Sequence, residues 1–444
     1  MTLLQAVRER RWVPVLGAGA YVAALAAGYY YNLTFVQLGL VDLGTRLVGM
    51  ERRDVSVLMA VLAVATLVVA LATGVVLDRR GWGADLRIKL RVLLAVVVVQ
   101  LGLTVAAPAV ATPRGLLAWV LVCAVPLGCG IPVMFSLMGD LVPVADRGHV
   151  AAVVAGLAFF AAALFPMQWR VEEFSRMLAV GMAAALPVLA WAASGRSRLV
   201  DLLAAQDLGP GRFCRGASAG ERADAGRGTF VVLVVLMFVV FFVDSLGFLR
   251  IVEAPVLMAA SWQSTDVGVR VFIAVTHVVG AAMAGVLYTA FARRWLFLWI
   301  FGLFAFTHLL YTFALRGGGD GVPPLTLPLF YVLAVSFYTT LNFALWPDLS
   351  TARTIGLRTA VGVGVAGWLA SFLSTALALW SADAGVPLEA HLRWVDALAL
   401  LALVTVPVVL YARRVRLLAR EGVPDEPGPH RPAAAVAGPA DLRR

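Results

Sequence analysis

The sequence predicts an all-α polytopic membrane protein with twelve transmembrane helices in two pseudo-symmetric six-helix bundles. The chain has 444 residues, of which 61% are hydrophobic and only 14% are charged, whereas a soluble domain carries about 25% charged residues. Its mean hydropathy is +0.89. A helix that crosses the hydrocarbon core needs about 20 apolar residues, and the chain can supply twelve such segments. This composition excludes a disordered chain, a fibrous protein and an ordinary soluble enzyme.

Charge-free stretches give the positions of the predicted helices. Twelve stretches of 16 or more residues contain no Asp, Glu, Lys or Arg, as spans require, because one charge at the bilayer centre costs about 3 kcal/mol on insertion scales. They are continuously apolar, which excludes the alternating pattern of transmembrane β-strands. In chain order they are 12–41, 55–77, 92–113, 115–139, 148–169, 177–195, 228–243, 271–292, 295–315, 321–347, 359–382 and 397–412.

Two of these stretches have features of their own. The first follows the basic tail Arg8–Arg11 and carries no small-residue cleavage site, so we expect a retained first helix rather than a signal peptide. The fourth contains Pro126 and Pro132 together with Gly128 and Gly130. Prolines and glycines inside a span indicate a kinked helix.

Polar segments divide the chain into four predicted parts. Residues 1–194 form an N-terminal six-helix bundle, 195–228 a cytoplasmic linker, 229–418 a C-terminal six-helix bundle, and 419–444 a disordered cytoplasmic tail. With a cytoplasmic N-terminus, the cytoplasmic segments carry the excess of Lys and Arg behind the net charge of +10. We therefore expect a multi-pass protein of the plasma (inner) membrane, with both termini in the cytoplasm. The positive charge is spread over the loops, so we expect no nucleic-acid partner.

The two halves of the chain resemble each other. The stretches of the second half begin 203 to 220 residues after their counterparts in the first half. Four residues near the junction of the fourth and fifth stretches also recur 208 positions later. They are Asp140, Gly148, Ala152 and Gly156, which reappear as Asp348, Gly356, Ala360 and Gly364. Internal repeats of this kind are the architecture of many secondary transporters.

The segment that closes the second stretch carries a motif. Gly74 is followed after three residues by Asp78 and Arg79, and after one more residue by Gly81. This pattern resembles the signature of the loop between the second and third helices of the major facilitator superfamily, and the twelve stretches extend the resemblance over the whole chain. The resemblance implies a transporter that works by alternating access as a monomer in the lipid bilayer. The Arg in helix 4 that is common in proton-coupled members and the Gly-Pro signature in helix 5 of drug antiporters are absent.

The resemblance also implies a gate on the cytoplasmic side. Gly74 would let a neighbouring helix approach closely, and Asp78 would face the positive N-terminal end of the eleventh helix, near residues 355–358. Asp78, Arg79 and Gly81 would then lock the cytoplasmic side. The alternative is a loop whose charges only set the topology. Four further charged residues are expected at this gate, as pairs in the two halves: Asp140, Arg147, Asp348 and Arg358.

Polar residues inside predicted helices are candidates for binding cargo, because such groups are costly in lipid. Those that we select lie on the first, eighth and tenth helices, and they are Tyr30, Asn32, Gln37, His277 and Asn342. For the amides, the alternative is a hydrogen bond between helices, which contributes about 0.6 kcal/mol on average. No second histidine lies at ligand spacing from His277, so we predict no metal site.

Asp244 stands just beyond the apolar stretch 228–243. It is the candidate for coupling a proton or a sodium ion to transport. The alternative is a carboxylate at the outer interface that pairs with Arg250. Glu253 lies three residues after Arg250, on the same helix face, and we expect these two residues to form an outer pair.

The predicted spans also restrict the cargo. No Lys or Arg lies deep inside any of them, and burying a bare anion is costly. We therefore expect a small organic solute that is neutral, amphipathic or cationic. The sequence contains no His-Glu-x-x-His motif and no P-loop, so we expect neither an enzyme nor a cofactor. The alternative is a non-transporting protein of the same fold that serves as a receptor or an assembly factor.

Overall fold

The computed structural model is helical throughout the regular secondary structure that it describes. Parts of the predicted linker 195–228 and of the predicted tail 419–444 lie outside the described residues. The described residues are 2–165, 170–206, 222–290, 293–316 and 324–421.

The helices follow one another with short connections. Their bounds are α1 (Leu3–Arg8), α2 (Trp12–Tyr31), α3 (Leu40–Asp42), α4 (Arg52–Arg79), α5 (Leu86–Ala106), α6 (Pro113–Leu141), α7 (Arg147–Leu164), α8 (Val171–Ala193), α9 (Arg198–Ala204), α10 (Arg222–Val252), α11 (Pro255–Met258), α12 (Val267–Ala290), α13 (Arg293–Arg316), α14 (Thr326–Asp348), α15 (Ile355–Val361), α16 (Ala370–Asp383) and α17 (Leu388–Glu421).

Twelve helical segments within the described residues are long and apolar enough to cross a membrane, which confirms the predicted all-α, twelve-helix class. Charged residues extend these helices beyond the charge-free stretches, because charged side chains at helix ends can reach the membrane surface. For this reason α10 begins at Arg222, inside the predicted linker, and α17 continues to Glu421, three residues into the predicted tail.

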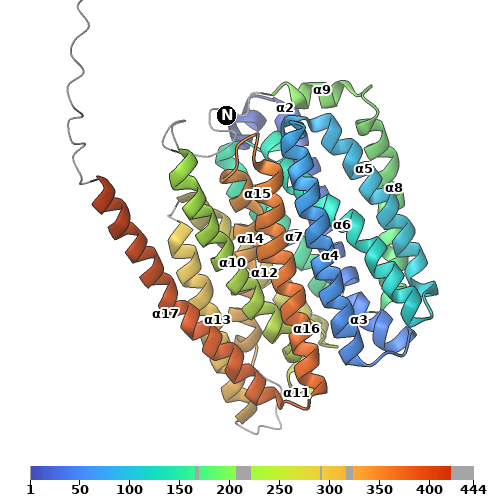
Figure 1. Ribbon diagram of the computed structural model, residues 1–444, viewed down its shortest axis with the longest axis vertical. Helices are drawn as coiled ribbons and strands as arrows, with labels where there is room; N and C mark the ends of the chain where they lie inside the picture. The colour runs from blue at the N-terminus through green and yellow to red at the C-terminus, as the bar shows by residue number, and fades with distance from the viewer. Residues whose placement is uncertain (1, 166–169, 207–221, 291–292, 317–323, 422–444) are drawn as a thin grey trace, which may run out of the picture.

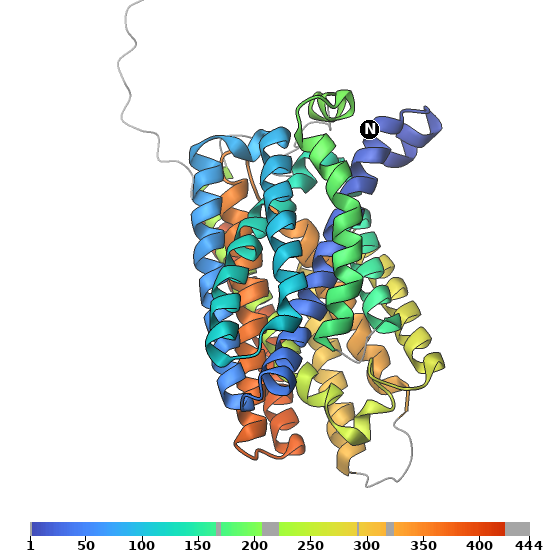
Figure 2. The same ribbon diagram turned by 90° about the vertical axis from the view of Figure 1, so that its right-hand side faces the viewer.

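The long helices stand side by side, and the short helices α9 and α11 lie at opposite ends of the molecule (Figures 1 and 2). We call these the α9 end and the α11 end. In Figure 1, the N-terminal helices α4, α5, α6 and α8 lie on one side, and the C-terminal helices α10, α13, α16 and α17 lie on the other. The two groups meet where α4 packs on α15 and α16, and where α7 packs on α12.

Two glycine contacts bring the bundles together, and they are equivalent under the internal repeat. A Cβ atom on Gly74 of α4 would lie 2.6 Å from the carbonyl oxygen of Gly356 in α15, and 2.9 Å from the Cβ of Ala360. A Cβ atom on Gly285 of α12 would lie 2.9 Å from the carbonyl oxygen of Gly148 in α7, and 2.8 Å from the Cβ of its neighbour one turn on, Ala152. Gly148 and Ala152 are the residues that recur 208 positions later as Gly356 and Ala360. Small residues thus let the helix backbones touch.

Replacing Gly74 with alanine is expected to destabilise the protein by about 1–3 kcal/mol, because the new methyl group must push two backbones apart. The thermal midpoint of the detergent-solubilised protein measures this loss. Gly102→Ala in α5 is the matched control, since nothing lies within 4 Å of a Cβ at that position. Equal midpoints for the two variants would contradict the close contact.

Two membrane-spanning segments contain widened, π-helical stretches. The first span has Asn32–Gly39, which follows α2, and Leu43–Leu47, which follows α3, and the eleventh span has Gly362–Leu369, between α15 and α16. A π-turn is rare and occurs most often next to functional sites, where it redirects the side chains that follow. The first stretch carries Thr34 and Gln37 towards the centre of the molecule, where both residues line a pocket.

Candidate functional site

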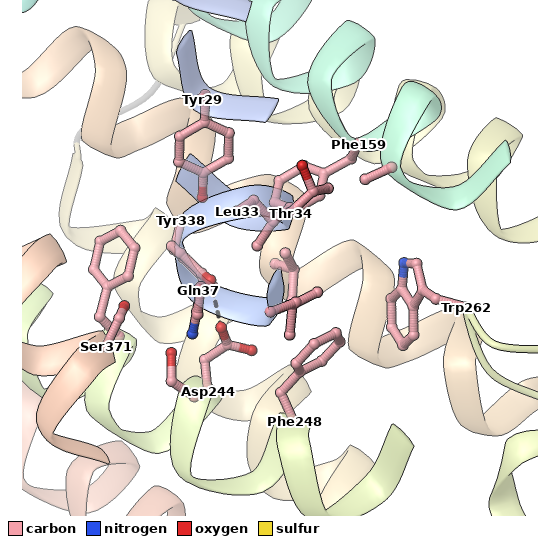
Figure 3. A pocket seen from close by; sticks show the side chains of 15 residues that line it. Tyr29, Leu33, Thr34, Gln37, Phe159, Asp244, Phe248, Trp262, Tyr338 and Ser371 are labelled. Carbon is pink, nitrogen blue, oxygen red and sulfur yellow. Dashed lines mark hydrogen bonds between the residues drawn. The ribbon is translucent and has the colours of Figure 1, made fainter. Parts of the chain in front are cut away.

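A small cavity of about 60 Å³ lies between the two bundles. Its walls come from the first span and α7 in the N-terminal half, from α10, α14 and α16 in the C-terminal half, and from the connection between α10 and α12 (Figure 3). We call it the central pocket. The residues that line it are Tyr29, Leu33, Thr34, Gln37, Leu38, Phe159, Ala162, Phe241, Asp244, Ser245, Phe248, Trp262, Val335, Tyr338 and Ser371.

Asp244 supplies the carboxylate of the central pocket. Its side chain accepts two hydrogen bonds of 2.6 Å, one from the hydroxyl of Tyr331 to Oδ1 and one from the hydroxyl of Tyr338 to Oδ2. The residue is only 8% exposed, and among the described residues no Lys or Arg lines the pocket with it. A buried carboxylate without a cationic partner is costly, so this site favours the binding of a proton or a cation.

Six of the fifteen residues that line the central pocket are aromatic. The rings of Phe248 and Trp262 meet edge to face at 5.2 Å between centroids, and those of Tyr29 and Phe159 meet at 5.6 Å. Such rings present an electron-rich face to whatever lies in front of them. In Figure 3, Phe248 and Trp262 lie on the same side of Asp244, and Tyr29 lies across the pocket.

Gln37 is the one predicted cargo residue that lines the central pocket. Its side-chain amide donates to the hydroxyl of Thr375 at 3.0 Å, a bond that also joins the first span to α16. The hydroxyl of Tyr30 donates instead to the carbonyl oxygen of Phe165 at 3.1 Å. The first span therefore holds these two polar side chains in different surroundings.

The two asparagines are engaged within their own helices. Asn32 donates to the carbonyl oxygen of Gly28 at 2.8 Å, one turn earlier. The side-chain oxygen of Asn342 accepts a hydrogen bond of 2.7 Å from the indole of Trp346, one turn later. Neither asparagine lines the central pocket.

His277 lies behind the pocket wall, fully buried. The indole N–H of Trp262 donates to its Nε2 at 3.2 Å, and its Nδ1 lies 2.9 Å from the hydroxyl of Ser336. Because an indole nitrogen can only donate, Nε2 is the acceptor and the ring proton sits on Nδ1. The ring also stacks on Phe159 at 4.4 Å. His277 thus positions two aromatic rings of the pocket instead of contacting its interior.

The motif residues lie at the α9 end. The two carboxylate oxygens of Asp78 accept hydrogen bonds of 2.8 Å from the backbone amides of Gly356 and Leu357, in the first turn of α15. The first amides of a helix have no partner within the helix and attract negative charge. Gly81 takes the left-handed conformation (φ +69°) that turns the chain after α4, whereas the side chain of Arg79 is exposed.

Buried ion pairs lie near the motif. Arg147 of α7 donates to Asp348 of α14 at 2.8 Å, and both side chains are fully buried. The hydroxyl of Tyr288 in α12 donates to the same carboxylate at 2.7 Å. Of the four predicted gate residues, Arg147 and Asp348 pair with each other across the bundles, whereas Asp140 pairs within the N-terminal bundle. Asp140 pairs with Lys89, the only lysine of the chain.

The remaining predicted gate residue, Arg358, donates to the carbonyl oxygen of Leu349. Its guanidinium group also lies over the ring of Phe230, 5.4 Å from the centroid. This arginine therefore ties the first turn of α15 to the chain segment that follows α14 and to α10.

The α11 end carries a different ion pair from the expected one. Glu253 accepts a hydrogen bond of 2.9 Å from Arg52, at the start of α4, whereas Arg250 donates to the carbonyl oxygen of Val386 at 2.8 Å. Burial raises the pKa of the Glu253 carboxyl, although Arg52 acts in the opposite direction. Asp78 and Arg147 at one end and Glu253 at the other thus join the two bundles on both sides of the central pocket.

Comparison with solved structures shows which fold the chain has. The chain is similar to the human organic anion transporter MFSD10 (TETRAN), with 18% identity and a TM-score of 0.55, over 90% of this chain and 99% of that one. It is similar to the xylose transporter XylE from E. coli, in a partially occluded inward-open conformation, with 16% identity and a TM-score of 0.58, over 88% and 96%. Its fold is that of the major facilitator superfamily.

A third structure with the major facilitator fold extends the comparison. It is a bacterial homologue of the iron transporter ferroportin in an outward-facing state, with 13% identity and a TM-score of 0.54, over 90% of this chain and 98% of that one. No family model and no curated protein sequence matches the chain. The fold is therefore recognised through structure, together with the motif that begins at Gly74.

Sequence reasoning missed several residues of the site. Tyr331 and Tyr338 are seven residues apart, two turns of one helix, so their spacing could have indicated a shared face opposite Asp244. Lys89 stood out as the only lysine, which was a usable signal for a special role. Trp262 comes from a connection between helices, and no periodic pattern marks it.

Proposed function

We propose that this chain is a secondary transporter that moves a small organic solute across the plasma membrane by alternating access. The observation that carries the proposal is the central pocket, which lies between the two bundles and contains a buried carboxylate. The bundles, residues 1–194 and 229–418, would rock about this pocket and open it to one side at a time. The transporters of this fold compared above carry the names of an organic anion, xylose and iron, so the fold alone does not select the cargo.

Membrane orientation follows from the arginines. The α9 end faces the cytoplasm in this proposal, because the polar segments on that side carry the excess of positive charge. Asp78 on the first turn of α15 and Arg147 on Asp348 then hold the cytoplasmic side closed. Glu253 and Arg52 hold the outer side. Cargo binding in the central pocket would loosen one set of contacts and favour the other.

Asp244 is the group through which a proton or a sodium ion would be coupled to transport. Its carboxylate faces the same pocket as Gln37, so the binding of an ion and the binding of cargo are within reach of each other. An ion that neutralises Asp244 removes the cost of the buried charge. The free energy released by this neutralisation would favour one arrangement of the bundles over the other.

The test begins with a thermal-shift screen of the detergent-solubilised protein against neutral, cationic and anionic metabolites. A ligand at a hundredfold excess over its Kd stabilises the folded protein by about 2.7 kcal/mol. We expect a solute whose shift is lost in Gln37→Ala and kept in Asn32→Ala, and which also drives counterflow in liposomes. A solute that binds in this way without counterflow would identify a non-transporting protein of the same fold.

The motif gate yields a prediction of its own. Asp78→Asn is expected to open the cytoplasmic side, because a carboxylate at a helix N-terminus contributes up to about 2 kcal/mol in partly buried geometries. A cysteine that replaces the buried Leu77, in a background without native cysteines, should then react at least about threefold faster with a membrane-impermeant maleimide. Asp54→Asn, which removes an exposed carboxylate near the other end of α4, should leave the rate unchanged. Equal rates in both variants would argue against the gate.

A further inference from the structure

We propose that the central pocket selects a small organic ammonium ion, with the ammonium group next to Asp244. The inference rests on the proposed function, since it takes this pocket as the cargo site, and it narrows the cargo to one charge class. It also places the cargo's own positive charge where an inorganic ion would otherwise bind.

The carboxylate of Asp244 leaves a negative charge in the pocket that the described lining residues do not balance. Asp244 is held by two tyrosine hydroxyls that both donate to its oxygens. Such bonds stabilise the ionised form of a carboxylate, yet they bring no positive charge to balance it. The described residues that line the pocket include no Lys and no Arg. A monovalent cation in the pocket supplies the missing charge, whereas an anion would meet a like charge.

Aromatic rings line two sides of the pocket. Phe248 and Trp262 line one side with their ring centroids 5.2 Å apart, and Tyr331, which does not line the pocket, lies 5.8 Å from Trp262. On the other side, Phe241 meets Tyr338 at 4.6 Å. An organic cation over the face of such a ring is attracted to it, most strongly where both are shielded from water. A bare divalent metal ion instead requires several carboxylate and other oxygen ligands, and Asp244 is the one carboxylate among the described residues that line the pocket.

Two of the polar side chains that line the pocket already donate hydrogen bonds within the protein. The hydroxyl of Thr34 donates to the carbonyl oxygen of Tyr30 at 2.6 Å, and Gln37 donates to Thr375. Specific recognition of a polyol requires several donors and acceptors that point into the pocket. One carboxylate with aromatic walls fits an alkylammonium group better than a sugar.

The volume of the central pocket also restricts the cargo. A dry cavity of about 150 Å³ accommodates benzene, and the central pocket measures about 60 Å³ in this conformation. It therefore suits a compact ammonium head group. Any larger part of the cargo would have to enter as the bundles separate.

Three probes of one shape test the charge preference. They are tert-butylammonium chloride, tert-butanol and sodium pivalate, which carry the same tert-butyl group with a positive, a neutral and a negative end. Calorimetric titration of the detergent-solubilised wild type should show tert-butylammonium binding at least tenfold tighter than tert-butanol, and pivalate binding more weakly than both. Equal affinities, or a preference for pivalate, would overturn the proposal.

Variants then assign the preference to the pocket. Asp244→Asn should lower the ratio between the affinities for the ammonium and the alcohol to less than threefold, while Asp383→Asn, at the exposed carboxylate that ends α16, should keep that ratio. Trp262→Leu leaves the carboxylate in place and should weaken ammonium binding threefold or more. It provides a second test if the Asp244 variant does not fold. Retention of the full preference in both variants would refute the assignment.

The binding measurement is independent of transport. A wild type that prefers tert-butylammonium but shows no counterflow would keep this inference and reject the proposed transport. A wild type that exchanges a neutral solute and shows no preference for tert-butylammonium would support the proposed transport and reject this inference.

Discussion

Asp348→Asn is expected to destabilise the protein by about 3–5 kcal/mol, which is the usual cost of removing one partner from a buried ion pair. Both side chains of the pair with Arg147 are fully buried. Asparagine keeps a group that can bond to Tyr288 but removes the negative charge, so the guanidinium group is left in a low-dielectric site. The thermal midpoint in detergent measures the loss, and the substitution does not touch the ion pair of Arg52 and Glu253 at the α11 end.

Two further variants separate the charge effect from a general effect of mutation. Glu389→Gln removes an exposed partner of Arg316 and should leave the thermal midpoint nearly unchanged, because solvent screens surface ion pairs. The double variant Arg147→Met with Asp348→Leu removes both charges and should recover most of the lost stability, because an apolar pair of similar size often replaces a buried ion pair well. If the double variant is less stable than Asp348→Asn, the charge explanation is wrong.

Asp244→Asn is expected to abolish solute accumulation in liposomes. Asparagine preserves the size of the side chain and can still accept a hydrogen bond from a tyrosine, but it can bind neither a proton nor a cation in the same way. Losing one member of a desolvated charge interaction costs about 2–5 kcal/mol, which corresponds to a 30-fold or larger loss of cargo affinity. Asp383→Asn should transport normally.

Two transport measurements distinguish ion coupling from cargo binding at Asp244. In liposomes without a membrane potential, accumulation against a gradient requires ion coupling, whereas exchange at equal concentrations requires only cargo binding and movement of the bundles. Loss of both modes is the expected result if Asp244 holds an ammonium cargo. Loss of accumulation with normal exchange would assign Asp244 to ion coupling alone and would contradict the ammonium proposal. A variant that accumulates cargo normally would remove Asp244 from both roles.

The sequence was sufficient for the fold because its signals are local. Each span is marked by the absence of charge over a stretch, and the pattern from Gly74 to Gly81 identifies one helix end. The family resemblance that this pattern carries implied that Asp78 meets the start of the eleventh helix, and in the structure its carboxylate lies on the first turn of α15. The spans themselves need only composition and helix length, whereas the partner of Asp78 came from the resemblance.

The pocket was harder to predict because it depends on how each helix is rotated. Asn32 and Gln37 both lie in the π-helical stretch Asn32–Gly39, yet only Gln37 lines the pocket. The side chain of Asn32 instead donates to the carbonyl oxygen of Gly28 in its own helix. Asn342 is bonded to Trp346 one turn away, a partner that spacing allows but does not require. The pairing of Arg147 with Asp348 joins residues 201 positions apart, and no local pattern encodes it.

The two glycine contacts have a consequence for the origin of the molecule. The N-terminal half carries Gly74 from one contact and Gly148 from the other, and each meets the repeat counterpart of the other glycine in the second half. Two copies of one ancestral half could therefore have formed both contacts at once, as a symmetric dimer in which each copy gave and received the same surface. Fusion of the two genes would then have preserved an existing interface. It would also have freed Asp244 and its tyrosines, which occur on one side only, to change without altering the other half.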